Sequence, residues 1–207
     1  IQEGGHYDWG TISGPITVWR LIAAGVVVLV AFVVWQHVQK GSEPLLPLPL
    51  FRDRNFALAN LAITAVGVAI SSFALPLTLW AQDVKGFSPT QAALLLTPMA
   101  ALTAALAPLV GRLTRRVDAK WVAAAGLVGF SGGLLWLGAV VGADAGWPRV
   151  LGPSVLLGVA NAAMWGPLSA TATRNLPPHL AGAGSGLYNT MRQVGGVLGS
   201  AGIAALM

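Results

Sequence analysis

The sequence predicts an all-α membrane protein with six transmembrane helices. Of the 207 residues, 55% are hydrophobic and only 9% are charged, whereas a soluble domain carries about 25% charged residues. The mean hydropathy is +0.70. Between short polar segments lie uncharged stretches of about twenty residues. At about 1.5 Å per residue, such stretches match the roughly 30 Å hydrocarbon core of a bilayer.

The lysines and arginines are concentrated on one predicted side of the membrane. The segments predicted to lie inside contain Lys40, Arg52, Arg54, Arg112, Arg115, Arg116, Lys120 and Arg174, and those predicted to lie outside contain Lys85 and Arg149. This bias is typical of cytoplasmic loops, so we expect residues 1–15 to lie outside a cell membrane. Topology therefore explains the net charge of +5, and no nucleic-acid partner is predicted.

Residues 1–15 are predicted to form an outer loop, because they are glycine-rich and contain acidic but no basic residues. The first span covers 16–37, with Arg20 one turn inside its start, where the side chain can extend to the headgroups. Residues 38–55 are predicted to form an inner loop, whose closely spaced prolines prevent a regular helix. Asn55 is expected to cap the helix that follows.

The second span, from about Phe56 to Trp80, carries a stripe of polar and small residues. These recur at helical spacing, at Asn60, Thr64, Gly67, Ser71, Thr78 and Gln82. The stripe has two interpretations: it lines a cavity, or it packs closely against a neighbouring helix with interhelical hydrogen bonds. We favour the cavity, because amide and hydroxyl groups are costly when they face lipid.

The third span begins with a predicted capping box, in which Ser88 and Gln91 satisfy each other's backbone N–H groups. Thr90 to Gly111 contains no charge. Pro98 and Pro108 lie within this span, where membrane helices tolerate proline if neighbours satisfy the freed carbonyls. We expect one helix that is either continuous or bent at a proline.

A basic turn follows the third span. Its predicted switch-loop residues are Gly111, Arg112, Arg115, Arg116, Asp118 and Lys120. In the simpler interpretation, the turn only anchors the topology. Asp118 is expected to cap the fourth span, 121–142, which has no polar stripe and is predicted to face lipid on much of its surface.

The fifth and sixth spans, 149–173 and 182–207, carry the remaining polar stripes. Arg192 lies about ten residues, and so roughly 15 Å, from the inner end of the sixth span. Either it contacts a substrate, an anion or a carboxylate, or it ties helices together; both interpretations stay open. The predicted pathway residues are Asn60, Thr64, Ser71, Asn161, Trp165, Asn189, Arg192 and Gln193.

No catalytic, metal or cofactor site is predicted. The seven acidic residues lie in turns or at span edges, and the three histidines are far apart in the sequence. A proton-coupled carrier usually needs an ionisable group at membrane depth, and arginine does not release its proton at physiological pH. Any proton-coupling carboxylate is therefore expected in a part of the protein outside this chain.

Several segments resemble a known family. Residues 111–120 resemble the second copy of the G-x-L-a-D-r-x-G-r-k loop of major facilitator superfamily transporters: Gly111, Leu113, Arg116 and Lys120 match, while Arg115 replaces the family's aspartate and Asp118 its second glycine. The linker 44–56 is similar to the 14-span drug:proton antiporter branch, the EmrB/QacA type. So are residues 80–98 and the segment GAGSGLYNTMRQVGG at 182–196.

This resemblance implies a transporter fragment. Residues 16–37 would be the second of two central helices, and 56–207 would be the first five helices of the C-terminal half. The last helix and the N-terminal half, its partner, would be missing, and both ends are expected to be cuts in a longer protein. The implied function is proton-coupled efflux of multiple drugs or amphipathic compounds by alternating access. The alternatives are a carrier for a specific metabolite and a non-transporting membrane scaffold.

Overall fold

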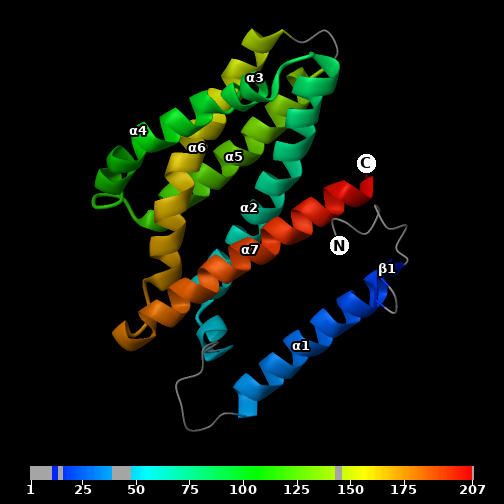
Figure 1. Ribbon diagram of the computed structural model, residues 1–207. Coiled ribbons are helices and arrows are strands. Elements are labelled where there is room, and N and C mark those ends of the chain that lie inside the picture. Colours follow the sequence, from blue (N-terminus) through cyan, green and yellow to red (C-terminus); the bar gives the residue numbers. More distant parts are fainter. Residues whose placement is uncertain (1–10, 14–15, 39–47, 143–145, 207) are drawn as a thin grey trace.

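The computed structural model describes residues 11–13, 16–38, 48–142 and 146–206. The long helices are α1 (Val18–Val38), α2 (Arg54–Leu79), α4 (Thr97–Leu113), α5 (Ala119–Val140), α6 (Trp147–Thr173) and α7 (Ala181–Leu206). The shorter elements are β1 (Thr11–Ser13), β2 (Ile16–Thr17), the 3₁₀ turns η2 (Leu48–Arg52) and η4 (Pro178–Leu180), the π-helical turn η3 (Trp80–Val84), and α3 (Pro89–Leu94). Figure 1 shows α1 apart from the bundle of α2 to α7.

The predicted helical membrane fold is confirmed. Among the described residues, four helical stretches are long and apolar enough to cross a bilayer: Arg54–Val84, Pro89–Leu113, Ala119–Val140 and Pro148–Thr173. The polar and glycine-rich α7 is not one of these four, although its 26 residues are long enough for a span. It crosses α2 (Figure 1), with close approaches from Gly184, near Phe56, to Gly199, near Val68, so this part of α7 lies at the same depth as α2.

The N-terminal part differs from the predicted boundaries. β1 pairs antiparallel with β2, so the first helix begins at Val18 rather than at residue 16. Residues 1–10 and 14–15 of the predicted outer loop 1–15 lie outside the described residues, as do residues 39–47 of the predicted inner loop, 143–145 and Met207.

Two of the three predicted helix caps are present. Ser88 and Gln91 form the expected capping box at α3, and the Asp118 carboxylate accepts the backbone N–H of Lys120 at the start of α5. The prediction of Asn55 as a cap is wrong. Asp53 caps α2 by accepting the N–H of Phe56 at 2.8 Å, because the helix already begins at Arg54.

The third span is interrupted next to Pro98, in keeping with the second of the two expectations, a helix bent at a proline. α3 ends at Leu94 and α4 starts at Thr97. Pro98 lacks an N–H group, and its ring collides with the carbonyl four residues earlier, at Leu94, so a regular helix cannot pass through this point. Pro108 lies inside α4 and does not interrupt it.

Glycines set how closely the helices cross. A Cβ on Gly126 of α5 would lie 2.9 Å from the backbone of Ala163 on α6, and one on Gly158 of α6 would lie 2.9 Å from the Met99 carbonyl on α4. Real Cβ atoms do not approach neighbours so closely. The tightest crossing is between α2 and α7, where Gly195 and Gly199 lie against the α2 backbone.

The buried face of α5 is narrower than its exposed one. Its buried residues are Val122, Ala123, Gly126, Phe130, Gly133 and Leu137, which form one stripe against α6. On the other side, Val128 and Leu135 are exposed over 74% and 77% of their surfaces. This distribution agrees with a helix that faces lipid over much of its circumference.

The loops gather into two ends, as the alternating topology predicts. Asn175 after α6 donates a hydrogen bond to Asp53 before α2, and Arg174 contacts Asp118 before α5. We call this the basic end; its described basic residues are Arg52, Arg54, Arg112, Arg115, Arg116, Lys120 and Arg174. At the opposite end, the Trp80 indole donates to the Gly142 carbonyl at 3.2 Å.

Candidate functional site

One face of α7 presents polar side chains that no neighbouring helix covers. Ser185, Asn189 and Gln193 follow one another at intervals of four residues, and all three are exposed. Among the described residues, the Asn189 amide donates to the Ser185 carbonyl of its own helix, at 3.0 Å. Polar groups of this kind are costly in hydrocarbon. This face of α7 therefore requires water, a ligand or another polar protein surface against it.

Arg192 lies beside this face and contacts α6. Its guanidinium carbon is 5.5 Å from the centre of the Trp165 ring, a cation–π distance. The Trp165 indole N–H in turn donates to the Asn161 side-chain oxygen, one turn earlier on α6. The fold thus joins three predicted pathway residues, from two helices, into one half-buried group with a permanent positive charge.

The polar stripe of α2 lies against α7. Asn60 is only 1% exposed and donates to the Phe56 carbonyl, and Thr64 donates to the Asn60 carbonyl. The backbone of Thr64 adjoins Gly195, and the Ser71 hydroxyl adjoins Gly196. In this conformation Thr64 and Ser71 lie at a close helix crossing and Asn60 is buried one turn before Thr64. The role of all three in a transport pathway stays a prediction.

Three buried polar atoms around this crossing have no hydrogen-bond partner among the described residues. They are Asn60 Oδ1, the Tyr188 hydroxyl and Arg192 Nε. An unsatisfied buried group costs about 1–3 kcal/mol. This cost is removed when a ligand, a water molecule or another part of the protein supplies the missing hydrogen-bond partner.

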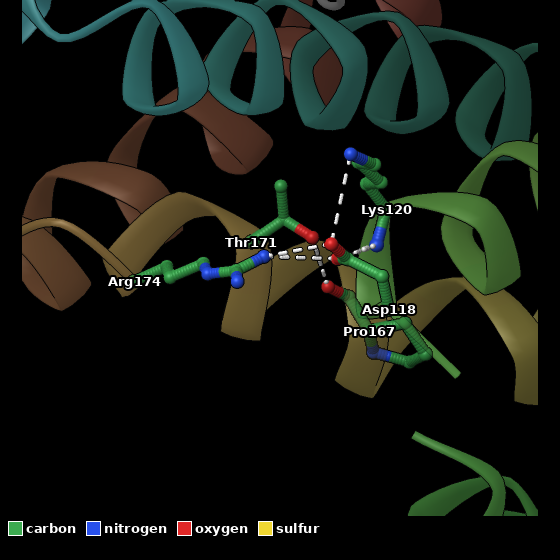
Figure 2. Close-up of polar contacts among 5 residues, drawn as sticks. All are labelled: Asp118, Lys120, Pro167, Thr171 and Arg174. Carbon is green, nitrogen blue, oxygen red and sulfur yellow. Dashed lines mark hydrogen bonds and ion pairs between the residues drawn. The ribbon is translucent and has the colours of Figure 1, made fainter. Parts of the chain in front are cut away.

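At the basic end, Asp118 joins two segments that are distant in the sequence (Figure 2). One guanidinium nitrogen of Arg174 contacts both carboxylate oxygens of Asp118, at 3.0 and 2.9 Å. The Lys120 ammonium lies 3.6 Å from the same carboxylate. The hydrogen bond from Arg174, followed by that from the Lys120 backbone, lowers the pKa of Asp118.

Asp53 repeats this arrangement on α2. One carboxylate oxygen caps the helix and the other accepts the Asn175 amide at 2.8 Å. The bond from Asn175, followed by that from the Phe56 backbone, lowers the pKa of Asp53. Adjacent residues after α6 therefore hold the starts of both α2 and α5. We call Asp53, Asp118, Arg174 and Asn175 the polar belt.

Sequence analysis predicted only part of the belt. Arg174 and Asn175 were missed as site residues, because their partners lie 56 and 122 positions away. Gly111, Arg112, Arg115 and Arg116 of the predicted switch loop are all exposed, and the described ion pairs of this loop involve Asp118 and Lys120.

Replacing Asp118 by asparagine should remove its ion pair with Arg174 and keep its cap on α5, because asparagine caps a helix as well as aspartate does. We expect Asp118→Asn and Arg174→Gln each to lower the melting temperature of the purified protein by about 1–3 °C, because an exposed ion pair contributes little stability. The double variant should be no less stable than either single one, and Arg115→Gln, at an exposed residue of the same loop, should leave the melting temperature unchanged. Additive losses would contradict a shared interaction.

The pH dependence gives a second test of the same pair. Since the folded-state pKa of Asp118 is lowered, the pair is intact above the ordinary carboxyl pKa of about 3.9 and is lost only as pH falls below it. Between pH 5 and 8, roughly the physiological range, we therefore expect the melting temperatures of wild type and Asp118→Asn to follow pH with curves of the same shape. A difference in shape between the two curves in this range would contradict the assignment.

Comparison with known proteins decides the family. A model described as Major Facilitator Superfamily matches residues 9–200. The chain belongs to this superfamily. Its predicted resemblance to major facilitator transporters is thereby confirmed, and the chain is part of a multi-pass membrane protein.

Three relatives are named as a transporter, a multidrug resistance protein and an export protein. Over its whole length, the chain is 41% identical to the uncharacterized MFS-type transporter Rv1250 of Mycobacterium tuberculosis and covers 35% of it. It is 30% identical, again over its whole length, to the multidrug resistance protein Stp of that species, covering 37%. Over 97% of its length it is 32% identical to the cephamycin export protein CmcT of Amycolatopsis lactamdurans, covering 40%. The chain thus spans well under half of these relatives.

Proposed function

We propose that the chain is part of a secondary active transporter that exports multiple drugs or amphipathic compounds by alternating access, driven by protons. The observation that carries the proposal is the uncovered polar face of α7 beside Arg192. Membrane depth, exposed amide groups and a fixed cation together suit a water-accessible pathway. The name of the relative CmcT, a cephamycin export protein, supports export as the direction, and the name of Stp, a multidrug resistance protein, supports drugs as substrates.

The polar face would meet the other half of the transporter across a central pathway. Asn189 and Gln193 on α7, with Asn161 and Trp165 on α6, would then line this side of it. Trp165 offers an apolar ring and the amides offer hydrogen bonds, a combination that suits amphipathic compounds. Arg192 would attract an acidic group, either of a substrate or of the partner half.

The polar belt would act during the conformational change. Alternating access requires one end of the bundle to open while the other closes. Hydrogen bonds at exposed positions contribute little static stability, so the belt can break and re-form at low cost. We infer that the basic end lies on the cytoplasmic side of the cell membrane, in keeping with the distribution of Lys and Arg.

Proton coupling would use a carboxylate elsewhere in the protein. Among the described residues, Asp53, Asp83 and Asp118 are the acidic ones, and all three lie at helix ends. None of them is at the depth where a transported proton would be exchanged.

An efflux assay on the whole transporter tests this function. Everted vesicles that contain the protein should accumulate several unrelated amphipathic dyes when a proton gradient is imposed. A protonophore should abolish this accumulation, and vesicles without the protein serve as the control. Accumulation that persists in the protonophore would contradict proton coupling.

A second candidate is a transporter for one specific compound, favoured by the similarity to a cephamycin export protein. The same dye panel separates the two candidates. A drug exporter should accept several unrelated compounds, whereas a specific carrier should accept one compound and its close analogues.

A further inference from the structure

A groove of about 660 Å³ opens at the basic end between α2, α5 and α6. Arg54, Asn55 and Lys120 lie at its mouth, and Ala62 and Leu127 are among its deeper residues. Ala62 is eight residues beyond Arg54, and Leu127 is seven beyond Lys120. At about 1.5 Å per residue the groove therefore extends roughly 10–12 Å from the basic end towards the middle of the membrane.

The mouth of the groove is positively charged and its walls are apolar. None of the described residues that line it is acidic, and both Arg54 and Lys120 are exposed. The nearby Asp118 lies closer to Arg174, at 2.9 Å, than to Lys120, at 3.6 Å. Asp118 is thus shared between Arg174 and Lys120, so that one carboxylate faces two cations and, with Arg54, the mouth of the groove keeps an excess of positive charge.

The neighbouring aromatic residue indicates that this mouth lies at a membrane surface. Trp121 is 67% exposed, and the Lys120 ammonium is 5.7 Å from its ring centre. Exposed tryptophan with a flanking lysine is typical of the level of the lipid headgroups. A ligand that fits this position needs an anionic group at the interface and an apolar part in the hydrocarbon.

We propose that the groove binds one anionic phospholipid of the leaflet at the basic end. The lipid phosphate would lie between Arg54 and Lys120, with the Asn55 amide as a further donor, and one acyl chain would extend between α2 and α5 past Ala62 and Leu127. Basic pockets between membrane helices are suited to such headgroups. A free phosphate ion could use the two cations but not the apolar walls.

Lipid binding to the whole transporter tests the site. The purified protein is titrated with phosphatidylglycerol or phosphatidylcholine of identical chains, and bound lipid is counted by native mass spectrometry. Wild type should prefer phosphatidylglycerol. The variant R54Q/K120Q should lose at least about tenfold of that affinity, since each cation near an anionic surface contributes about fivefold. The matched control R115Q/R116Q, with the same loss of charge in exposed residues outside the groove, should stay within about twofold.

A second variant tests the apolar wall without changing charge. Ala124 is an exposed residue of α5 that lines the groove, so Ala124→Trp should obstruct the acyl chain and weaken phosphatidylglycerol binding. Equal binding of the two lipids by wild type would overturn the proposal, as would equal losses in the groove and control variants. Displacement of the lipid by millimolar inorganic phosphate would show an anion site rather than a lipid site, and would also overturn it.

Discussion

Gly195→Leu is expected to prevent α2 and α7 from associating, and so to abolish folding of the transporter half. A Cβ at Gly195 would overlap the backbone of Thr64, and backbone atoms cannot rotate away as a flexible side chain can. The crossing is tight on both sides, since a Cβ on Gly67 of α2 would likewise meet the α7 backbone at Arg192. Overpacking a well-filled contact costs about 1–3 kcal/mol or more, and leucine adds four carbons here.

A glycine on the same helix provides the matched control. Gly202 has no atom within 4 Å of a built Cβ, so Gly202→Leu adds the same side chain without a collision. Removing glycine from a helix interior is itself favourable by about 0.5–1 kcal/mol. The fraction of reporter-tagged protein that elutes as a single species in size-exclusion chromatography should fall to background for Gly195→Leu. It should stay at the wild-type level for Gly202→Leu, and equal elution of both would show that the α2–α7 crossing is not required.

Arg192→Gln is expected to reduce efflux by about tenfold or more while the protein still folds. The substitution removes the only positive charge that the described part of α7 carries, and with it the cation above Trp165. A tenfold loss corresponds to about 1.4 kcal/mol of transition-state or binding free energy. Arg192→Lys keeps the charge and should retain part of the activity.

The same variants distinguish a pathway residue from a structural tie. Arg149→Gln makes an identical charge change at an exposed position at the opposite end and should transport normally. If Arg192 only ties helices together, Arg192→Gln should lower the melting temperature and the yield, and the protein that remains should transport at the wild-type rate. Normal efflux by a stable Arg192→Gln protein would exclude a role in the pathway.

The helix caps show how far local sequence determines this fold. The Ser88 capping box and the Asp118 cap depend on groups within a few residues of each other, and both were predicted. At α2 the same reasoning selected Asn55 over Asp53, although either residue type can cap a helix. The residue at which α2 begins was set by the turn η2 before the helix and by the distant contact between Asp53 and Asn175.

The glycine pairs of α7 show what local sequence does not determine, namely which pair packs against another helix. Gly182/Gly186 and Gly195/Gly199 have the same spacing in the sequence. Yet only the second pair packs against α2, and the first has no atom within 4 Å of a built Cβ. Spacing places two residues on one face of a helix, but it does not say which neighbour the face meets.

The sequence alone determined the membrane class and the helical fold, and it predicted the sidedness, which stays a prediction. Each of these follows from hydropathy, charge and capping within short segments, where the decisive interactions are with the solvent or with near neighbours. Only the tertiary structure decided that Arg192 lies over Trp165, that Arg174 binds Asp118, and that the cationic groove opens between α2 and α5. These features join residues tens of positions apart in the sequence. Their geometry follows from how closely the helices approach one another at their glycines.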